Sequence, residues 1–162
     1  MTNSYDLVIF GGGNAGFGVS AIANEAGQKI AFVEEWDFSG TCPNRGCTPK
    51  QVLVAAAHAM HEIDTAASHC IRVSKPELNW SDFIRREKDM IRAIPDAMAG
   101  VAKKRDDAFR GTATFINTNT VAAGDKILEA KNIVIATGSK PRPLPIPGAE
   151  YMITSDDILS ER

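Results

Sequence analysis

The chain contains, close to its start, Asp6-Leu7-Val8-Ile9-Phe10-Gly11-Gly12-Gly13-Asn14-Ala15-Gly16, and the rest of its fold can be worked out from this stretch. The first half is a continuous apolar run, which is typical of a strand buried on both faces of a parallel sheet. After the glycines, residues 17–26 are mostly small and helix-compatible, Gly27 ends them, and Lys29–Val33 is a second apolar run. The order strand, turn, helix and strand predicts a βαβ unit and therefore an α/β, Rossmann-like fold with a parallel sheet.

The glycines fit the pattern G-x-G-x-x-G of a dinucleotide-binding turn. Gly11 would allow the tight turn, Gly13 would let a pyrophosphate approach the backbone, and Gly16 would let the helix pack closely on the strand. Asn14 and Ala15 open the helix, whose free N–H groups and dipole favour phosphate. We expect a dinucleotide here; the alternative is a glycine-rich turn without a ligand.

A carboxylate is also expected in such a site, where it accepts hydrogen bonds from the adenosine ribose. Glu34 directly follows the second apolar run, and Glu35 is the neighbouring alternative. We predict Glu34 because it stands at the strand end itself.

A second motif follows at Gly40-Thr41-Cys42-Pro43-Asn44-Arg45-Gly46-Cys47-Thr48-Pro49-Lys50. Residues 49–63 predict a helix with proline in its first turn, where proline is tolerated. Cys47 would then lie at a helix N-terminus, which lowers a thiol pKa and favours the thiolate. Cys42, further out on the loop, would be freer to attack a disulfide. The motif predicts a redox-active dithiol.

Two other interpretations of the cysteine pair stay open, a structural disulfide and half of a metal site. A disulfide across so short a loop gains little chain entropy. A zinc site needs further ligands at suitable spacing. Cys70, His58, His61 and His69 offer no clean second pair, so we predict no metal.

Composition limits the function classes. The chain has 162 residues, 44% of them apolar, and a net charge of −2 with both signs dispersed, which predicts a globular domain without a basic face for nucleic acid. We see no apolar run long enough to cross a bilayer and no secretory signal at Met1–Asp6, so we expect a cytoplasmic protein without a membrane partner. Dithiols in that compartment are more often catalytic than structural.

The remaining pattern divides into a helical and a β-rich part. Residues 64–76 predict a loop, and residues 81–107 predict a long helix interrupted at Pro95, with Trp80 and an apolar stripe in the core. Three short runs then predict a small antiparallel β-meander, and a buried strand ends at a turn where a ligand could approach. The ranges are 112–116, 120–123 and 126–130 for the meander, 132–136 for the strand and 137–139 for the turn. A stiff proline-rich segment then leads to a helix cap at Ser155.

With these motifs together, the chain resembles the class I pyridine nucleotide–disulfide oxidoreductases, a flavoprotein family that includes glutathione reductase, dihydrolipoamide dehydrogenase and mercuric reductase. The motifs that carry the resemblance are Gly11–Gly16 with Glu34, the dithiol segment, and Ala136-Thr137-Gly138-Ser139. The resemblance implies that residues 1–162 are the N-terminal segment of an FAD-binding domain.

The resemblance also implies roles for individual residues. FAD, and not NAD, would occupy the first site, with Cys47 as the flavin-side thiolate and Cys42 as the thiol that exchanges with substrate. Electrons would pass from NAD(P)H to flavin, to the disulfide and to a substrate disulfide. The motifs and the resemblance together assign the cofactor to Gly11, Gly13, Asn14, Ala15, Gly16, Glu34, Gly40, Thr41, Cys42, Lys50, Thr112, Ala113, Thr137 and Gly138.

Departures from the family limit what the resemblance implies. Lys50-Gln51 favours a glutathione-reductase-like protein, while Pro43 and Arg45 replace common apolar residues and leave the substrate open. We find no second G-x-G-x-x-G for NAD(P)H and no interface domain of the kind that makes full-length relatives homodimers. We therefore expect a truncated chain without turnover by itself. The alternatives are a dihydrolipoamide dehydrogenase or mercuric reductase relative and a non-catalytic FAD- or nucleotide-binding module.

Overall fold

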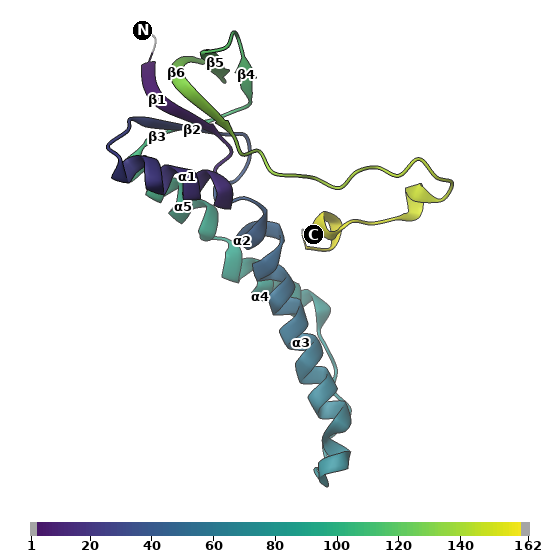
Figure 1. Cartoon of the computed structure of the whole chain (residues 1–162). Helices are drawn as coiled ribbons and strands as arrows, with labels where there is room; N and C mark the ends of the chain where they lie inside the picture. Colours follow the sequence, from purple (N-terminus) through teal and green to yellow (C-terminus); the bar gives the residue numbers. More distant parts are fainter. Residues whose placement is uncertain (1–2, 160–162) are drawn as a thin grey trace.

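A computed structural model describes residues 3–159, and a six-stranded sheet forms its centre (Figure 1). The strands are β1 (Asn3–Phe10), β2 (Ile30–Glu34), β3 (Asp107–Arg110), β4 (Ala113–Phe115), β5 (Thr120–Ala123) and β6 (Lys126–Ile135), in the order β3-β2-β1-β6-β5-β4. The pairs β1–β2, β1–β6 and β2–β3 are parallel, whereas β4–β5 and β5–β6 are antiparallel. The α/β, Rossmann-like fold class is confirmed.

The predicted βαβ unit consists of β1, helix α1 (Asn14–Glu25) and β2. β1 and β2 pair from Leu7 opposite Ile30 to Phe10 opposite Val33. Because consecutive side chains of a strand point to opposite faces, the continuous apolar run of β1 supplies both layers of the core. Its place between β2 and β6 explains why Val8 and Ile9 are fully buried.

Two hydrophobic clusters cover the two faces of the sheet. One contains Val8, Phe10 and Val33 together with residues of β5 and β6. The other contains Ile9 and Phe32 and is closed by residues of α1 and of α5 (Ile94–Arg105). The parallel strands are therefore covered on both sides, as their composition requires.

The meander and the final strand differ from the prediction, because residues 126–135 form the single strand β6. β6 pairs antiparallel with β5 near its start and parallel with β1 along nearly its whole length. The polar pair Lys131-Asn132 makes no turn: the Lys131 ammonium lies 2.6 Å from the Asp6 carboxylate, and the Asn132 amide donates to the Asp6 carbonyl. The meander and the parallel strands thus share one sheet.

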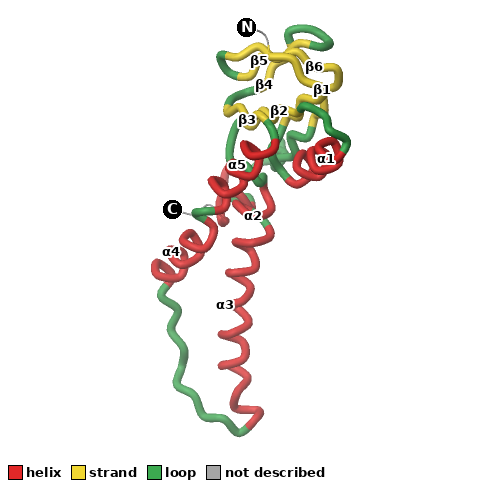
Figure 2. Tube along the Cα trace, turned by 90° about the vertical axis from the view of Figure 1, so that its left-hand side faces the viewer, coloured by secondary structure: helices red, strands yellow, loops and turns green. Residues whose placement is uncertain are grey.

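Helix α2 (Thr41–Arg45) and helix α3 (Cys47–Thr65) follow the βαβ unit, and α3 projects away from the sheet (Figures 1 and 2). After a short 3₁₀ turn at Ala66–His69, the chain runs back along α3 to α4 (Trp80–Ile91) (Figure 2). The predicted interruption near Pro95 is confirmed, since α4 ends before α5 begins at Ile94.

Two predictions for this region are wrong. Trp80 is 50% exposed and does not belong to the core, and the buried residue of α4 is Glu87. The predicted helix extends to residue 107, but helix α5 ends at Arg105 and residues 107–110 form β3, because their backbone completes the hydrogen bonding of β2 at the sheet edge. Both outcomes depend on neighbours that are remote in sequence.

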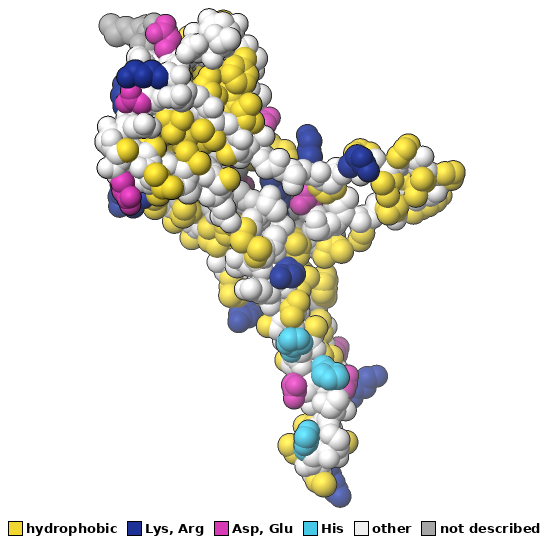
Figure 3. Space-filling model, viewed as in Figure 1, with side chains coloured by type: hydrophobic (Ala, Val, Ile, Leu, Met, Phe, Trp, Pro, Cys, Tyr) yellow, Lys and Arg dark blue, Asp and Glu magenta, His cyan; other side chains and the backbone are white. Residues whose placement is uncertain are grey.

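The C-terminal part leaves the sheet after β6 as an extended segment (Figure 1). It carries a 3₁₀ turn at Ala149–Tyr151 and the short helix α6 (Ser155–Leu159), which begins where the sequence predicted a cap. Apolar side chains are exposed along it (Figure 3). No helix within residues 3–159 is long and apolar enough to cross a membrane.

Candidate functional site

The turn after β1 requires glycine at two positions. Gly11 has φ +103°, and a Cβ there would lie 2.3 Å from the Ala136 carbonyl oxygen. A Cβ on Gly16 would lie 2.1 Å from the Gly11 carbonyl oxygen. The turn is held to its neighbours by the Gly11 N–H, which donates to the Val33 carbonyl at 2.9 Å. The predicted roles of a tight turn and of close helix packing match this geometry.

The glycine turn and the dithiol segment contact each other through their backbones. The Ser39 N–H donates to the Gly12 carbonyl at 2.6 Å. Gly40 has φ +70°, and a Cβ there would lie 2.9 Å from the Gly13 Cα. On the other side of the turn, Ala136 borders Gly11 and leads into Thr137 and Gly138, both of which are exposed. The structure thus brings together three motifs that are far apart in sequence.

The N-terminus of α1 is suited to a phosphate group. Gly13 is its N-cap and supplies no side-chain cap, and Asn14 and Ala15 are exposed. The first N–H groups of a helix have no acceptor within the helix, and its dipole places partial positive charge there. A Cβ on Gly13 would meet nothing closer than the Gly40 Cα, at 3.6 Å. These residues therefore fit the pyrophosphate of a dinucleotide.

The two acidic residues at the end of β2 have different partners. Glu34 is half-buried; its Oε2 accepts from the Gly12 N–H at 2.7 Å and its Oε1 from the Trp36 N–H at 2.7 Å. Glu35 is exposed, and the Thr112 hydroxyl donates to it at 3.2 Å. Each carboxylate oxygen has a further lone pair, so Glu34 can still accept from ribose hydroxyls. Thr112, predicted at the adenine half, lies directly before β4 and reaches Glu35, the residue after Glu34, through the hydrogen bond of its hydroxyl.

The cysteine pair lies at the junction of α2 and α3, and its exposure is the reverse of the expectation. Cys42 is not out on a loop but within α2, where it is half-buried. Cys47 begins α3, two residues before the predicted start at Pro49, and is exposed. The order is reversed because residues 41–45 coil into a helical turn instead of an open loop. Both thiols are free.

The pKa of Cys47 is raised, whereas the sequence predicted that it would be lowered. The largest cause is the side-chain hydrogen bond with Cys42, followed by the charge of Cys42. The Lys50 ammonium and the Cys47 backbone N–H act in the opposite direction. Two adjacent thiols cannot both ionise easily, because the second proton leaves beside an existing negative charge. The helix N-terminus is therefore outweighed by the neighbouring sulfur.

Several contacts of side chains around the dithiol are not among the sequence predictions. The Asn44 amide donates to the Phe38 carbonyl at 3.1 Å and to the Gly40 carbonyl at 2.9 Å, which ties α2 to the segment before it. A second group of contacts involves the segment after β2: Arg45 stacks on the Trp36 ring, and Arg110 donates to the Trp36 carbonyl. The tendency of asparagine to bond nearby backbone could have indicated Asn44. No local pattern indicates the other three.

The histidines form no metal site with the cysteines. Among residues 3–159, no group of three or more His, Cys, Asp or Glu side chains could hold a metal ion. The three histidines lie along the projecting part of α3 and the turn after it (Figure 3).

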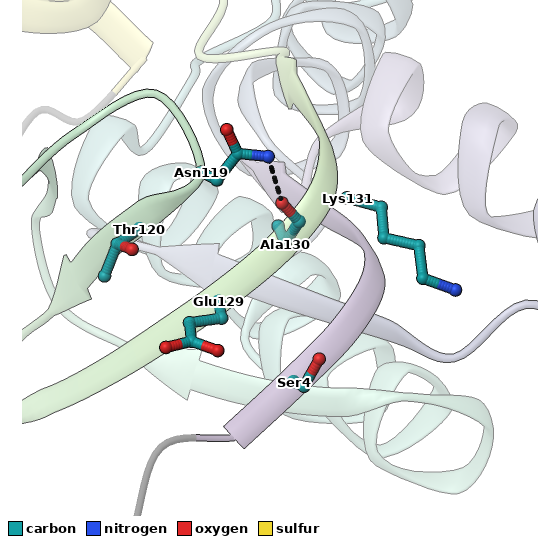
Figure 4. A pocket seen from close by; sticks show the side chains of 6 residues that line it. All are labelled: Ser4, Asn119, Thr120, Glu129, Ala130 and Lys131. Atoms are coloured by element: carbon teal, nitrogen blue, oxygen red, sulfur yellow. Dashed lines mark hydrogen bonds between the residues drawn. The ribbon is translucent and has the colours of Figure 1, made fainter.

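A shallow hollow of ≈ 240 Å³ lies away from the glycine turn (Figure 4). Its lining is polar and includes Ser4, Glu129 and Asn119, whose amide donates to the Ala130 carbonyl at 3.1 Å. Ser4 is near the start of β1, whereas Gly11 follows the end of that strand, so about 20 Å of strand separates the two places. The hollow is not part of the candidate site.

Comparison with known proteins gives relatives over nearly the whole chain. A glutathione reductase from Nostoc sp. is 36% identical over 159 residues, covering 98% of this chain and 35% of the relative. A dihydrolipoyl dehydrogenase from Chlamydia trachomatis is 31% identical, and a thioredoxin reductase from Emiliania huxleyi is 34% identical. The match to the dehydrogenase covers 98% of this chain, and the match to the thioredoxin reductase covers 96% of it. Each match covers 35% of the relative. It thus spans about a third of the length of the curated relatives it matches.

The family comparison agrees with these relatives and with the motifs. Residues 5–162 match the family described as pyridine nucleotide-disulphide oxidoreductase. The match includes the glycine turn, the cysteine pair and the turn after β6, which the fold brings to one end of the parallel strands. The chain therefore belongs to the pyridine nucleotide-disulphide oxidoreductase family.

Proposed function

We propose that the chain is the N-terminal, FAD-binding segment of a disulfide oxidoreductase that passes electrons from NAD(P)H through FAD and the Cys42/Cys47 pair to a disulfide substrate. The observation that carries the proposal is the backbone contact between Gly13 and Gly40. This contact joins the N-terminus of α1 to the segment that carries the cysteines. A dinucleotide cradle and a dithiol are therefore parts of one site.

The residues around the glycine turn would hold the cofactor. The N–H groups that begin α1 would bind the pyrophosphate, and Glu34 would accept from the adenosine ribose. Thr112 and Ala113 would contact the adenine half. Further residues would contact the flavin half: Gly40, Thr41, Cys42, Lys50, Thr137 and Gly138. When bound, FAD supplies the two-electron chemistry that connects NAD(P)H to the dithiol.

The cysteines would carry out thiol–disulfide exchange. The Cys42 thiolate attacks one sulfur of the substrate disulfide, forms a mixed disulfide and releases the first thiol of the substrate. The Cys47 thiolate then attacks the Cys42 sulfur and releases the second thiol. Two electrons pass to the substrate, and a Cys42–Cys47 disulfide remains. The two thiols are near enough for Cys42 to raise the pKa of Cys47, a proximity that the second step requires.

Glutathione disulfide is the proposed substrate. The Lys50-Gln51 pair and the 36% identity to the Nostoc glutathione reductase support it. The 31% identity to the Chlamydia trachomatis dihydrolipoyl dehydrogenase supports a lipoamide-type dithiol as the second candidate.

The first experiment is a visible absorption spectrum of the purified chain with and without added FAD, followed by chromatography of the released cofactor. We expect bound FAD, and after reduction a long-wavelength band that depends on the Cys47 thiolate. Cys47→Ser should remove this band, while Cys70→Ser, a change at an exposed cysteine in another part of the fold, should leave it. A folded chain that binds no FAD would contradict the proposal.

A further inference from the structure

The last residue of α2 contacts the segment after β2 through a cation–π interaction. The Arg45 Cζ lies 4.4 Å from the centre of the Trp36 ring. Arg45 is only three positions after Cys42, on the same short helix. Trp36 is 51% exposed, so its ring is not held by core packing. The contact therefore connects the helix that carries Cys42 to the segment that carries Glu34.

Helix α2 depends on such contacts because it is too short to be stable by itself. It has five residues and no side-chain cap. The hydrogen bonds of a single helical turn do not offset the conformational entropy lost when the turn is nucleated. The Asn44 amide attaches it to Phe38 and Gly40, which immediately precede it. The Arg45–Trp36 stack is a second side-chain contact between α2 and the segment after β2.

The backbone of Trp36 is held by hydrogen bonds, so the ring projects from a fixed point of the chain. The Trp36 backbone N–H donates to Glu34, and its carbonyl accepts from the Arg110 Nε at 3.1 Å and the Arg110 Nη2 at 2.7 Å. Arg110 also pairs with Asp37 at 2.7 Å. The segment that carries Trp36 is thus bonded both to the acid at the end of β2 and to the end of β3.

We propose that Arg45 is a positioning residue, which by stacking on Trp36 holds Cys42 within reach of Cys47. The inference rests on the proposed function of these cysteines as the redox pair. A direct effect of the Arg45 charge on the thiols is the competing explanation. The charge of Lys50 lowers the pKa of Cys47, whereas the contact that Arg45 makes is with the Trp36 ring. Its contact with Trp36 therefore points to a role in geometry.

The test measures how readily the two cysteines form a disulfide in the absence of flavin. In a Cys70→Ser background, the dithiol and glutathione disulfide give the Cys42–Cys47 disulfide and two glutathione thiols, so electrons and protons balance. Rapid alkylation and mass spectrometry give the equilibrium constant. Arg45→Leu and Trp36→Leu should each lower it about two- to fivefold, the range expected for a half-exposed cation–π contact. The double variant should show no further loss.

Conservative and matched variants separate position from charge. Arg45→Lys and Trp36→Phe retain a cation over an aromatic ring and should retain most of the equilibrium constant. Trp80→Leu is the matched control, because Trp80 is 50% exposed and lies on α4. Circular dichroism and thermal melting check folding, and Arg45→Gln replaces Arg45→Leu if the latter does not fold.

Two outcomes overturn the inference. One is an equilibrium constant that Trp36→Leu leaves unchanged. If Arg45 substitutions nevertheless lower it, the effect of Arg45 is due to its charge and not to the stack. The other is a fully additive loss in the double variant. Failure of the proposed function gives a different result. If the chain binds no FAD but its Cys42–Cys47 equilibrium constant depends on Arg45, the flavin assignment is wrong and the inference is supported. A wild-type chain that forms no Cys42–Cys47 disulfide overturns both.

Discussion

Backbone geometry constrains the glycines of the site, and the Cys42 thiol constrains the ionisation of Cys47. Gly11 and Gly40 both have positive φ and both lie against backbone atoms of another segment. Glu34 bonds the backbone of the glycine turn, so the acid proposed to bind ribose also shapes the turn that would bind the pyrophosphate. Substitutions at these positions should therefore affect folding and cofactor binding together.

Gly11→Ala should lower the free energy of unfolding by about 2–4 kcal/mol and reduce FAD binding. The new Cβ would lie 2.3 Å from the Ala136 carbonyl oxygen at φ +103°, and a left-handed conformation alone costs about 1–2 kcal/mol for a residue with a Cβ. Gly18→Ala is the control: Gly18 is in α1 with nothing near a Cβ, so this variant should gain about 0.5–1 kcal/mol. Urea unfolding measures both. Equal stabilities of the two variants would contradict the turn geometry.

Glu34→Ala should weaken binding of ADP, used as the adenosine half of FAD, and lower the free energy of unfolding by about 1–3 kcal/mol. The stability loss arises because the Gly12 N–H, which lies in a buried residue, loses its acceptor. Glu35→Ala removes only an exposed hydrogen bond to Thr112 and is the matched control. Calorimetric titration with ADP distinguishes them. A larger loss of affinity in Glu35→Ala would instead assign the ribose to Glu35.

The alkylation rate of Cys47 should depend on pH with an inflection above that of an ordinary thiol. The pKa of Cys47 is raised by Cys42, so the reactive thiolate accumulates only at higher pH. Cys42→Ser removes the neighbouring thiol, which is the largest cause of the raised pKa, and should move the inflection downwards, while Lys50 and the Cys47 backbone N–H still lower the pKa. Iodoacetamide kinetics in a Cys70→Ser background measure this. An upward shift on removal of Cys42 would refute the assigned cause.

At the scale of elements, continuous strands and short helices place the site. β6 runs without interruption past β1 and ends beside Gly11, which brings Ala136 to the glycine turn. α2 carries Cys42 but depends on Asn44 and Arg45 for its attachment. α4 supplies no residue to the site as described, but it buries a carboxylate.

Glu87→Gln should stabilise the chain near pH 7 by about 1 kcal/mol, because a neutral amide replaces a buried carboxylate whose charged form is penalised by desolvation. Glu87 is 2% exposed, its Oε1 has no partner among the described residues, and burial raises its pKa. A raised folded pKa means that this carboxyl favours folding when protonated and opposes it as pH rises through that pKa. The advantage of Glu87→Gln should therefore vanish in acid. Denaturant unfolding at pH 4 and pH 7 checks the sign, and Glu77→Gln, at an exposed position, should change neither.

At the scale of the whole molecule, the proportion of exposed apolar side chains is high in the segment after β6. Its exposed residues include Leu144, Ile146, Tyr151, Met152 and Ile153. Contiguous apolar surface on a monomer favours association. The purified chain should therefore associate as its concentration rises, and a Tyr151→Ser/Ile153→Ser variant should associate less. Static light scattering measures both, and a clean monomer at high concentration would contradict the expectation.

The sequence alone determined the βαβ unit, the need for glycine at positions 11 and 16 and the start of α3 close to the second cysteine. These follow from local causes: the period of apolar residues, the conformational freedom of glycine and the fit of proline in a first helical turn. Only the tertiary structure decided that Cys47 is more exposed than Cys42, that its pKa is raised, and that residues 126–135 form one strand. It also decided the Gly13–Gly40 and Arg45–Trp36 contacts. These depend on atoms brought together from separate parts of the chain, and no local pattern specifies such neighbours.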